Sequence, residues 1–147
     1  MKVEKKSFAP DETFEIASEL AATLQKGVLV GLSGEMGVGK THFAKGFAAG
    51  LEVKDLITSP TFLGISESRN GRLPFIHMDF YKKVASLEII EKYLANNSVV
   101  LIEWIENYKQ VFSRKLEASI SVYIQYCKDS SGNILEWERQ IVIDNSL

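Results

Sequence analysis

The chain has 147 residues, of which 46% are hydrophobic and 24% are charged, a composition typical of one soluble domain. Its 17 basic and 19 acidic residues give a formal net charge of -2, so the overall charge gives no reason to expect broad binding to nucleic acid or to an anionic membrane. No apolar run approaches the roughly 20 residues that span a bilayer, and the N-terminal segment lacks the apolar stretch of a signal peptide, so we expect a cytoplasmic protein that does not associate with membranes.

A helix is the first element that the sequence predicts. Asp11, directly after Pro10, is a candidate N-cap, and apolar residues then recur at helical spacing as far as Leu24. A short apolar strand over residues 28–33 follows, and a second helix begins at Thr41. The chain is therefore expected to run from a strand into a helix through a glycine-rich segment.

Two hairpins are predicted downstream. The segment "TFLGISESRNGRLPFIHMDF" divides into two strand-like halves at Asn70-Gly71, the dipeptide that best tolerates the positive φ angles of a tight turn. In the C-terminal segment, "ASISVYIQY" and "ILEWERQIVI" flank the turn-like residues "KDSSGN". Part of the sheet should therefore be antiparallel.

A short helix and a buried strand are expected between these hairpins. Leu87–Leu94 has helical spacing, whereas Val99–Ile102 is a continuous apolar run, as in strands that are covered on both faces of a parallel sheet. No repeat, low-complexity tract or linker divides the chain, so we predict a single domain over residues 1–147. The expected fold class is α/β, a three-layer sandwich with a mixed parallel and antiparallel sheet.

The segment with the clearest chemistry joins the first strand to the second helix. Residues Gly34–Thr41, "GEMGVGKT", match the G-x-x-x-x-G-K-T pattern of a phosphate-binding loop, or P-loop, which makes the expected sandwich similar to that of P-loop NTPases. Glycines let successive backbone N–H groups face a β-phosphate, and the positive end of the following helix adds to the attraction. Lys40 would supply charge to the β- and γ-phosphates, and the Thr41 hydroxyl would bind the accompanying Mg²⁺. The loop residues expected at the nucleotide are Met36, Gly37, Val38, Gly39, Lys40 and Thr41.

A nucleoside triphosphate site also needs a carboxylate near the metal, usually at the end of a strand beside the loop strand. Asp79 ends the run "PFIHMD" and Glu103 ends "VVLIE", and either could orient Mg²⁺ or its waters. Glu103 has the better sequence context and could instead act as a general base toward the attacking water. The alternative for each is a solvated acid at a strand end. Trp104, which follows Glu103, is either a core residue or a wall of the site.

The stretch "TSPTF" lies between the second helix and the first hairpin, where a loop could swing over the γ-phosphate. Thr61 offers a hydroxyl there, and Pro60 restricts the approach of the chain. Such a loop could act as a switch. An ordinary entry turn to a strand is the alternative.

Together these segments resemble one family, the small P-loop ATPases of bacterial tRNA threonylcarbamoyladenosine synthesis, of the TsaE (YjeE) type. Its motifs stand in family order across most of the chain as "GEMGVGKT", "TSPTF", "HMDFYK" and "LIEWIE". The resemblance implies that Lys40 and Thr41 serve ATP and Mg²⁺, that Thr61 belongs to a switch-like loop and that Trp104 is a site residue. By the same resemblance Glu103 and Asp79 are the catalytic and metal-site acids, and Glu12 is a neighbour of the adenine.

Membership of this family would make the protein a Mg²⁺-dependent ATPase, slow alone and stimulated by TsaB-like and TsaD-like partners, while TsaD modifies the tRNA. The chain has no basic stripe, so tRNA would be met only through those partners. Three residues depart from the family pattern. Lys82 replaces an arginine and cannot reproduce a two-pronged guanidinium contact, His42 replaces a hydroxyl residue, and Ile105 replaces a small residue or proline.

Two other functions remain open from the residues. A small-molecule or nucleoside kinase would use the same loop, but it usually carries an arginine-bearing lid, and no two of the four arginines are spaced like a clamp on one helix. A nucleotide-gated binding module would use ATP to order the "TSPTF" segment for a partner. A GTPase is disfavoured because the chain has no Asn-Lys-x-Asp segment to read guanine.

Overall fold

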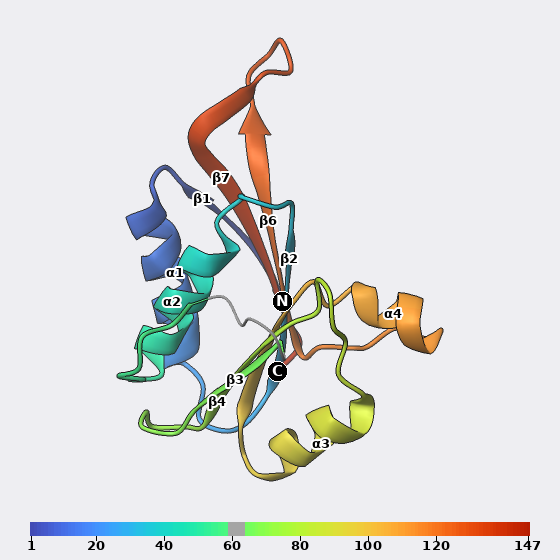
Figure 1. Ribbon diagram of the computed structural model, residues 1–147. Coiled ribbons are helices and arrows are strands. Elements are labelled where there is room, and N and C mark those ends of the chain that lie inside the picture. The colour runs from blue at the N-terminus through green and yellow to red at the C-terminus, as the bar shows by residue number, and fades with distance from the viewer. Residues whose placement is uncertain (59–63) are drawn as a thin grey trace.

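Helices cover both faces of one seven-stranded sheet in the computed structural model of the protein (Figure 1). The structure describes residues 1–58 and 64–147. The strand order across the sheet is β1-β7-β6-β2-β5-β4-β3. Along the chain the elements are β1 (Lys2–Ser7), α1 (Pro10–Ala22), β2 (Leu29–Gly34), α2 (Lys40–Gly50), β3 (Ile65–Ser68), β4 (Phe75–Asp79), α3 (Leu87–Ala95), β5 (Val99–Glu103), α4 (Asn107–Phe112), β6 (Ile120–Lys128) and β7 (Ile134–Asn145).

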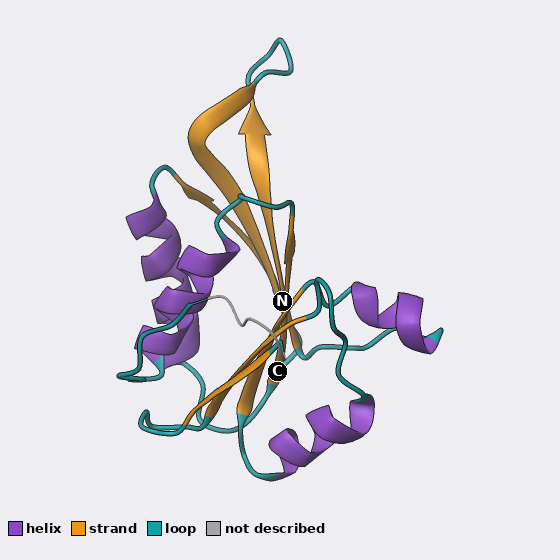
Figure 2. Cartoon of the chain, viewed as in Figure 1, coloured by secondary structure: helices purple, strands orange, loops and turns teal. Residues whose placement is uncertain are grey.

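The middle of the sheet is parallel and both flanks are antiparallel, which confirms the predicted mixed sheet. Strand β2 pairs in parallel with β5 on one side and with β6 on the other, and β4 pairs in parallel with β5. The pairs β3–β4, β6–β7 and β1–β7 are antiparallel. The end of the β6–β7 hairpin projects beyond the other strands (Figure 2).

Alternating side chains along β5 divide the core into two clusters and so produce the three layers. Val99 and Leu101 belong to the cluster that α1 and α2 cover, whereas Val100 and Ile102 belong to the cluster that contains residues of α3 and α4. All residues of β5 are buried, because helices lie on both faces of the sheet (Figure 1). The predicted α/β sandwich and its buried strand are confirmed.

The start of α1 differs from the sequence prediction. Ala9 is the N-cap, and Pro10 lies in the first turn, where its missing N–H leaves no helical bond unmade. The prediction of Asp11 as the N-cap was therefore wrong. Asp11 and Glu12 instead lie in the first turn, close to the positive end of the helix dipole, and the Glu12 carboxylate accepts a 2.6 Å hydrogen bond from the Phe8 N–H.

The β3–β4 hairpin is present, but its turn is not the tight Asn70-Gly71 turn that the sequence suggests. Residues 69–74 connect the strands, and neither Asn70 nor Gly71 has a positive φ. The Asn70 side chain accepts a hydrogen bond from the Lys54 N–H, and a Cβ on Gly71 would lie 2.5 Å from the Leu51 carbonyl oxygen. Contacts with the segment after α2 therefore determine this connection.

Two elements were not predicted. Strand β1 reads "KVEKKS" and exposes every side chain except that of Ser7, so it carries no apolar alternation and is positioned by its backbone pairing with β7. Helix α4 is only a short segment after β5. Within residues 1–58 and 64–147, no helix is both long enough and apolar enough to cross a membrane.

Candidate active site

The carboxyl ends of β2, β4 and β5 bring most of the predicted site residues to one edge of the sheet. Strand β2 ends at Gly34, where the glycine-rich loop begins. The parallel strands β4 and β5 end at Asp79 and Glu103, which stand opposite each other in register. Open α/β sheets bind their ligands at this edge, so the topology alone explains why these segments meet.

A pocket of about 410 Å³ lies at this edge. Its lining residues are Met36, Gly37, Gly39, Lys40, Thr41, His42, Asp79, Tyr81, Glu103 and Trp104. Three predicted residues are not in this set. Val38 packs its side chain into the core between α2 and the sheet, and Glu12 contacts the Phe8 N–H instead. Thr61 lies outside the described residues.

The loop before α2 curls through backbone conformations that glycine favours. Gly37 has a φ of 78°, and Gly39, the N-cap of α2, has a φ of 117°. The β2 end of the loop is tightly packed, since a Cβ on Gly34 would lie 2.5 Å from the Ile124 carbonyl oxygen. The predicted order of strand, glycine-rich loop and helix is confirmed, and the positive end of α2 adjoins the pocket.

The ammonium group of Lys40 is buried and turned toward its own loop. Its Nζ donates hydrogen bonds to the carbonyl oxygens of Gly34, at 2.6 Å, and Glu35, at 2.7 Å. Burial lowers the pKa of Lys40, and nearby carboxylates, Glu103 first among them, oppose that shift. The neighbouring carboxylates therefore favour the charged form of Lys40, which is the form that would attract a phosphate.

Trp104 forms a wall of the pocket and is only half-buried. Its φ of 57° is unusual for a bulky residue. Its backbone N–H donates a hydrogen bond to the Leu32 carbonyl of the adjacent strand β2. The indole ring packs against the Tyr81 ring, with 5.2 Å between centroids, and the Lys40 ammonium faces it. Trp104 therefore combines the two predicted positions, since it lines the pocket and also packs against the core cluster that contains residues of α3 and α4.

The two predicted acids occupy different environments. Glu103 is only 4% exposed, and its Oε2 lies 2.6 Å from Nε2 of His77. Asp79 is less buried, and its Oδ1 accepts a 2.9 Å hydrogen bond from the Tyr81 N–H. Burial raises the pKa of Asp79; the Tyr81 N–H opposes this shift, and the Glu103 carboxylate adds to it.

Three oxygen-bearing side chains of the pocket have the chemistry to take part in binding a Mg²⁺ ion. Among residues 1–58 and 64–147, no three His, Cys, Asp or Glu side chains form a group that could hold a metal ion alone. Magnesium is usually held by one or two carboxylates together with phosphate oxygens and water. Asp79, Glu103 and the Thr41 hydroxyl line the same pocket and supply such a partial set.

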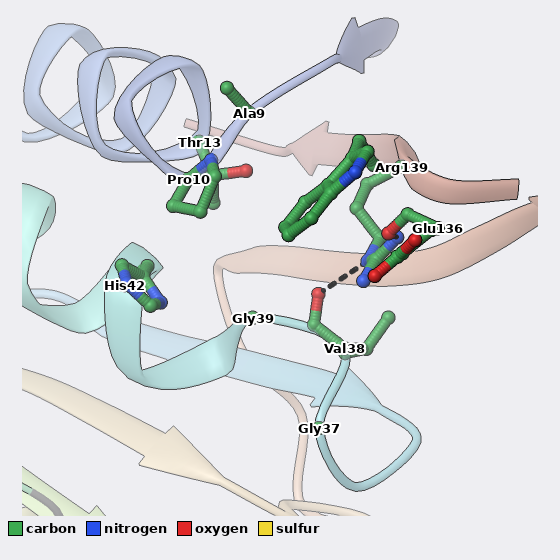
Figure 3. Close-up of a pocket in the computed structure, with 10 residues that line it drawn as sticks. Ala9, Pro10, Thr13, Gly37, Val38, Gly39, His42, Glu136 and Arg139 are labelled. Atoms are coloured by element: carbon green, nitrogen blue, oxygen red, sulfur yellow. Dashed lines mark hydrogen bonds between the residues drawn. The ribbon is translucent and has the colours of Figure 1, made fainter.

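A second pocket, of about 190 Å³, adjoins the same loop (Figure 3). Its lining residues are Ala9, Pro10, Thr13, Gly37, Val38, Gly39, His42, Glu136, Trp137 and Arg139. It lies between the start of α1, the loop and strand β7, and it shares Gly37, Gly39 and His42 with the larger pocket. The amino-acid sequence does not reveal this pocket, because its three segments are far apart in the chain.

Two side chains of the β6–β7 hairpin hold the backbone of the glycine-rich loop. Nε of Arg139 donates a 2.9 Å hydrogen bond to the Val38 carbonyl, shown as the dashed line in Figure 3. The Arg139 guanidinium carbon also lies 4.4 Å from the centroid of the Tyr126 ring, and the Tyr126 hydroxyl donates to the Met36 carbonyl at 3.2 Å. Neither residue was predicted as a site residue. The only signal in the sequence is that an aromatic residue and an arginine lie in the two strands of the predicted C-terminal hairpin.

Comparison with known proteins gives one consistent result. A family model described as "Threonylcarbamoyl adenosine biosynthesis protein TsaE" matches residues 8–141. Two of the similar proteins are both named tRNA threonylcarbamoyladenosine biosynthesis protein TsaE. The one from Bacillus subtilis is 41% identical over 65% of this chain and 61% of its own length, and the one from Treponema pallidum is 32% identical over 87% and 95%. A crystal structure titled "Crystal structure of Bacillus subtilus YdiB" matches 97% of this chain and 84% of its own, with 30% identity and a TM-score of 0.74.

Proposed function

This chain belongs to the TsaE family of tRNA threonylcarbamoyladenosine biosynthesis proteins, and we propose that within this pathway it is the subunit that binds and hydrolyses ATP. One observation carries the proposal. The loop residues Lys40 and Thr41 share a single pocket with the strand-end acids Asp79 and Glu103. A phosphate-binding loop facing carboxylates across a pocket is the arrangement that metal-assisted phosphoryl chemistry requires.

The triphosphate would occupy the larger pocket, with its β-phosphate in the curl of the loop. Lys40 would turn from the carbonyl oxygens of Gly34 and Glu35 to the phosphate oxygens. The phosphate oxygens would then accept the hydrogen bonds that the two carbonyls accept now. Thr41 and the two acids would hold the Mg²⁺ that comes with the nucleotide. Bound there, Mg²⁺ would neutralise charge that develops on the phosphate oxygens.

The base would lie in the second pocket, on the side of the loop that faces α1 and β7. The aromatic rings of His42 and Trp137 line that pocket and suit the flat face of a purine. Thr13 also lines it, next in sequence to Glu12, which the family resemblance places near the adenine. The glycine-rich loop, which borders both pockets, would then run along the phosphates between base and metal.

Glu103 is the better placed of the two acids to act on the attacking water. It is buried, and its carboxylate is held at 2.6 Å by His77, whereas Asp79 is more exposed and bonded to a backbone N–H. A fixed carboxylate can orient water or accept its proton. Asp79 would then serve mainly to bind waters of the metal.

We also propose protein partners and a cellular location for this chain. TsaB-like and TsaD-like partners would raise a slow intrinsic ATPase rate, and tRNA would be contacted through them rather than by this chain, whose net charge is -2. A cytoplasmic location, a single domain over residues 1–147 and a switch role for Thr61 belong to the same proposal.

The kinase alternative receives less support from the site. A kinase usually places an arginine over the transferred group, but none of the residues described around the larger pocket is an arginine. Arg72 instead donates to the carbonyls of Ala21 and Leu24, and Arg139 donates to the Val38 carbonyl. The arginine that a kinase would place over the transferred phosphoryl group therefore has no counterpart among the described residues that line the larger pocket.

The experiment that tests the proposal measures phosphate release from Mg²⁺-ATP by the purified protein, first alone and then with TsaB-like and TsaD-like proteins. We expect a slow rate that the partners raise, and Lys40→Ala serves as the blank. If the partners change nothing, while a pool of nucleosides or metabolites makes the protein consume ATP in stoichiometric amounts, the kinase alternative is correct. Absence of nucleotide binding by the unaltered protein contradicts both functions.

A further inference from the structure

We propose that His77 is a positioning residue for Glu103, and that its Nε2–H group holds the carboxylate in the orientation needed at the metal and water of the triphosphate pocket. The inference rests on the proposed function, because it concerns the same site. It goes beyond that function by assigning a role to a buried side chain that is not among the pocket's lining residues.

The contact joins two neighbouring strands across the sheet. His77 lies opposite Leu101 in the β4–β5 register, and Asp79 lies opposite Glu103, so His77 and Glu103 are diagonal neighbours on the same face. Their Nε2 and Oε2 atoms are 2.6 Å apart, and the residues are 1% and 4% exposed. Water therefore has little access to this hydrogen bond, and the pairing strongly restricts the carboxylate.

The other nitrogen of His77 shows that core packing alone does not explain this residue. A carboxylate accepts hydrogen bonds and does not donate them, so the shared proton belongs to Nε2. The opposite ring nitrogen, Nδ1, is buried and has no hydrogen-bond partner among residues 1–58 and 64–147. An unpaired buried polar atom costs stability, which an apolar side chain at this position would avoid.

The neighbours of His77 on β4 make the contrast clear. Phe75, Ile76 and Met78 are apolar and fully buried, and the His77 ring stacks on Phe75 with 6.0 Å between centroids and 25° between planes. A leucine or phenylalanine would suit these surroundings without an unpaired nitrogen. The feature that only a polar donor can provide here is the bond to Glu103.

The consequence for the site follows from the two oxygens of the carboxylate. With Oε2 engaged by His77, Glu103 retains one oxygen for a metal or a water in the pocket that it lines. Replacing a residue that holds a metal-binding side chain in this manner typically lowers metal affinity or activity about 10- to 100-fold. The effect should therefore appear in the metal-dependent part of nucleotide binding as well as in turnover.

The test compares His77→Leu, which removes the donor and stays apolar, with His77→Gln, whose side-chain amide nitrogen can reach the position of Nε2. ADP affinity is measured for each variant with excess Mg²⁺ and with EDTA, together with ATP turnover and the melting temperature. We expect His77→Leu to reduce the increase in ADP affinity that Mg²⁺ gives by a factor of roughly ten, and to reduce turnover by a similar factor. Its ADP affinity in EDTA should be nearly unchanged. His77→Gln should keep most of both.

A double-mutant cycle with Glu103→Gln separates positioning from a general structural effect. If His77 acts through Glu103, adding His77→Leu to Glu103→Gln should cause little further loss of the Mg²⁺-dependent gain. Met78→Leu, on the same strand but facing the opposite cluster, is the matched control and should leave that gain intact. If His77→Leu fails to fold, His77→Asn takes its place, because its shorter amide cannot reach Glu103.

Three outcomes overturn the inference: an unchanged Mg²⁺-dependent gain in folded His77→Leu, equal losses in the Gln and Leu variants, or full additivity with Glu103→Gln. In each case nucleotide binding by the unaltered protein would still support the proposed function. Failure of the unaltered protein to bind ADP or ATP at all would instead overturn the function and the inference together.

Discussion

The ammonium nitrogen of Lys40 lies 4.6 Å from the centre of the Trp104 indole ring. A cation over a tryptophan face is stabilised by roughly 0.5 to 2 kcal/mol, and the stabilisation increases as the pair is removed from water. Lys40 thus has three favourable partners in the absence of ligand, the indole ring and the two carbonyls of Gly34 and Glu35. A nucleotide bound as proposed would draw the lysine away from at least part of this arrangement.

The first prediction is that Trp104 emission reports nucleotide binding. In a Trp137→Phe background, which leaves Trp104 as the sole tryptophan, adding Mg²⁺-ADP should shift the emission maximum or intensity because Lys40 moves from the ring. Lys40→Met in the same background should change the emission before any nucleotide is added and respond weakly afterwards. Identical nucleotide-free spectra with and without the Lys40→Met change would contradict the ring contact.

The second prediction separates binding from turnover. Lys40→Ala removes the cation nearest the phosphates and should weaken ATP binding by at least about tenfold, as expected for loss of a charge-assisted contact. Glu103→Gln should retain more binding than Lys40→Ala, because Lys40 still contacts the phosphates and only the Mg²⁺-dependent part of binding is lost, and it should lose turnover. Calorimetric titration with ATP and single-turnover phosphate release provide the two quantities, and equal losses of both in the two variants would refute this division of roles.

The third prediction concerns pH. Burial raises the pKa of Asp79 in the folded protein, so ionisation of its carboxyl costs stability as the pH rises above the ordinary carboxyl range near 4. Asp79→Asn cannot ionise and can still accept the Tyr81 N–H, so it should raise the melting temperature at pH 7 to 8, and this advantage should shrink as the pH falls toward 4.

Thermal unfolding of the nucleotide-free protein at several pH values checks this expectation. Asp144→Asn, which alters an exposed carboxylate on β7, controls for the general effect of removing one negative charge. A gain for Asp79→Asn that is constant with pH, or a loss at neutral pH, would show that burial does not dominate at Asp79.

The fourth prediction addresses the connection between the hairpin and the loop. Arg139→Met removes the donor to the Val38 carbonyl and should lower nucleotide affinity about five- to tenfold, with a loss of stability of about 1 to 2 kcal/mol. Arg69→Met is the matched control, since its guanidinium pairs with Glu67 at the surface, and it should change stability by less than about 0.5 kcal/mol. Equal ADP affinities for the two variants would exclude a role of Arg139 in shaping the loop.

The fifth prediction tests the packing of α1 on α2. A Cβ on Gly46 would lie 2.1 Å from the Phe14 carbonyl oxygen, so Gly46→Ala must push the two helices apart. Despite the better helix propensity of alanine, this change should lower the free energy of unfolding by about 3 kcal/mol. Lys45→Ala, at the exposed neighbouring position, should stay within about 0.5 kcal/mol in the same urea titration, and comparable midpoints for both would contradict the close approach.

Much of the larger pocket could be predicted because its parts are encoded locally. The glycine-rich loop is one continuous motif, and Asp79 and Glu103 each end an apolar run. Parallel strands end at the same edge of a sheet, so these separate segments meet without any knowledge of the detailed packing.

The features that were not predicted depend on register or on contacts between distant segments. The bond between His77 and Glu103 requires the pairing of β4 with β5, and the second pocket requires β7 to lie beside the start of α1. Strand β1 was missed because pairing with β7 holds it without an apolar pattern. The Asn70-Gly71 prediction was wrong for a similar reason, since contacts with the segment after α2 override its local turn preference.

The position of β2 in the sheet has a consequence for the newly synthesised chain. Strand β2 pairs with β5 and β6, and both neighbours leave the ribosome much later than β2 itself. Until Ile124 has emerged, the strand that leads into the glycine-rich loop has an unpaired edge and apolar side chains, which favours association with other nascent chains. For a chain that binds nucleotide as proposed, retention of the ribosome-bound form on nucleotide resin would mark the moment at which the C-terminal hairpin has docked.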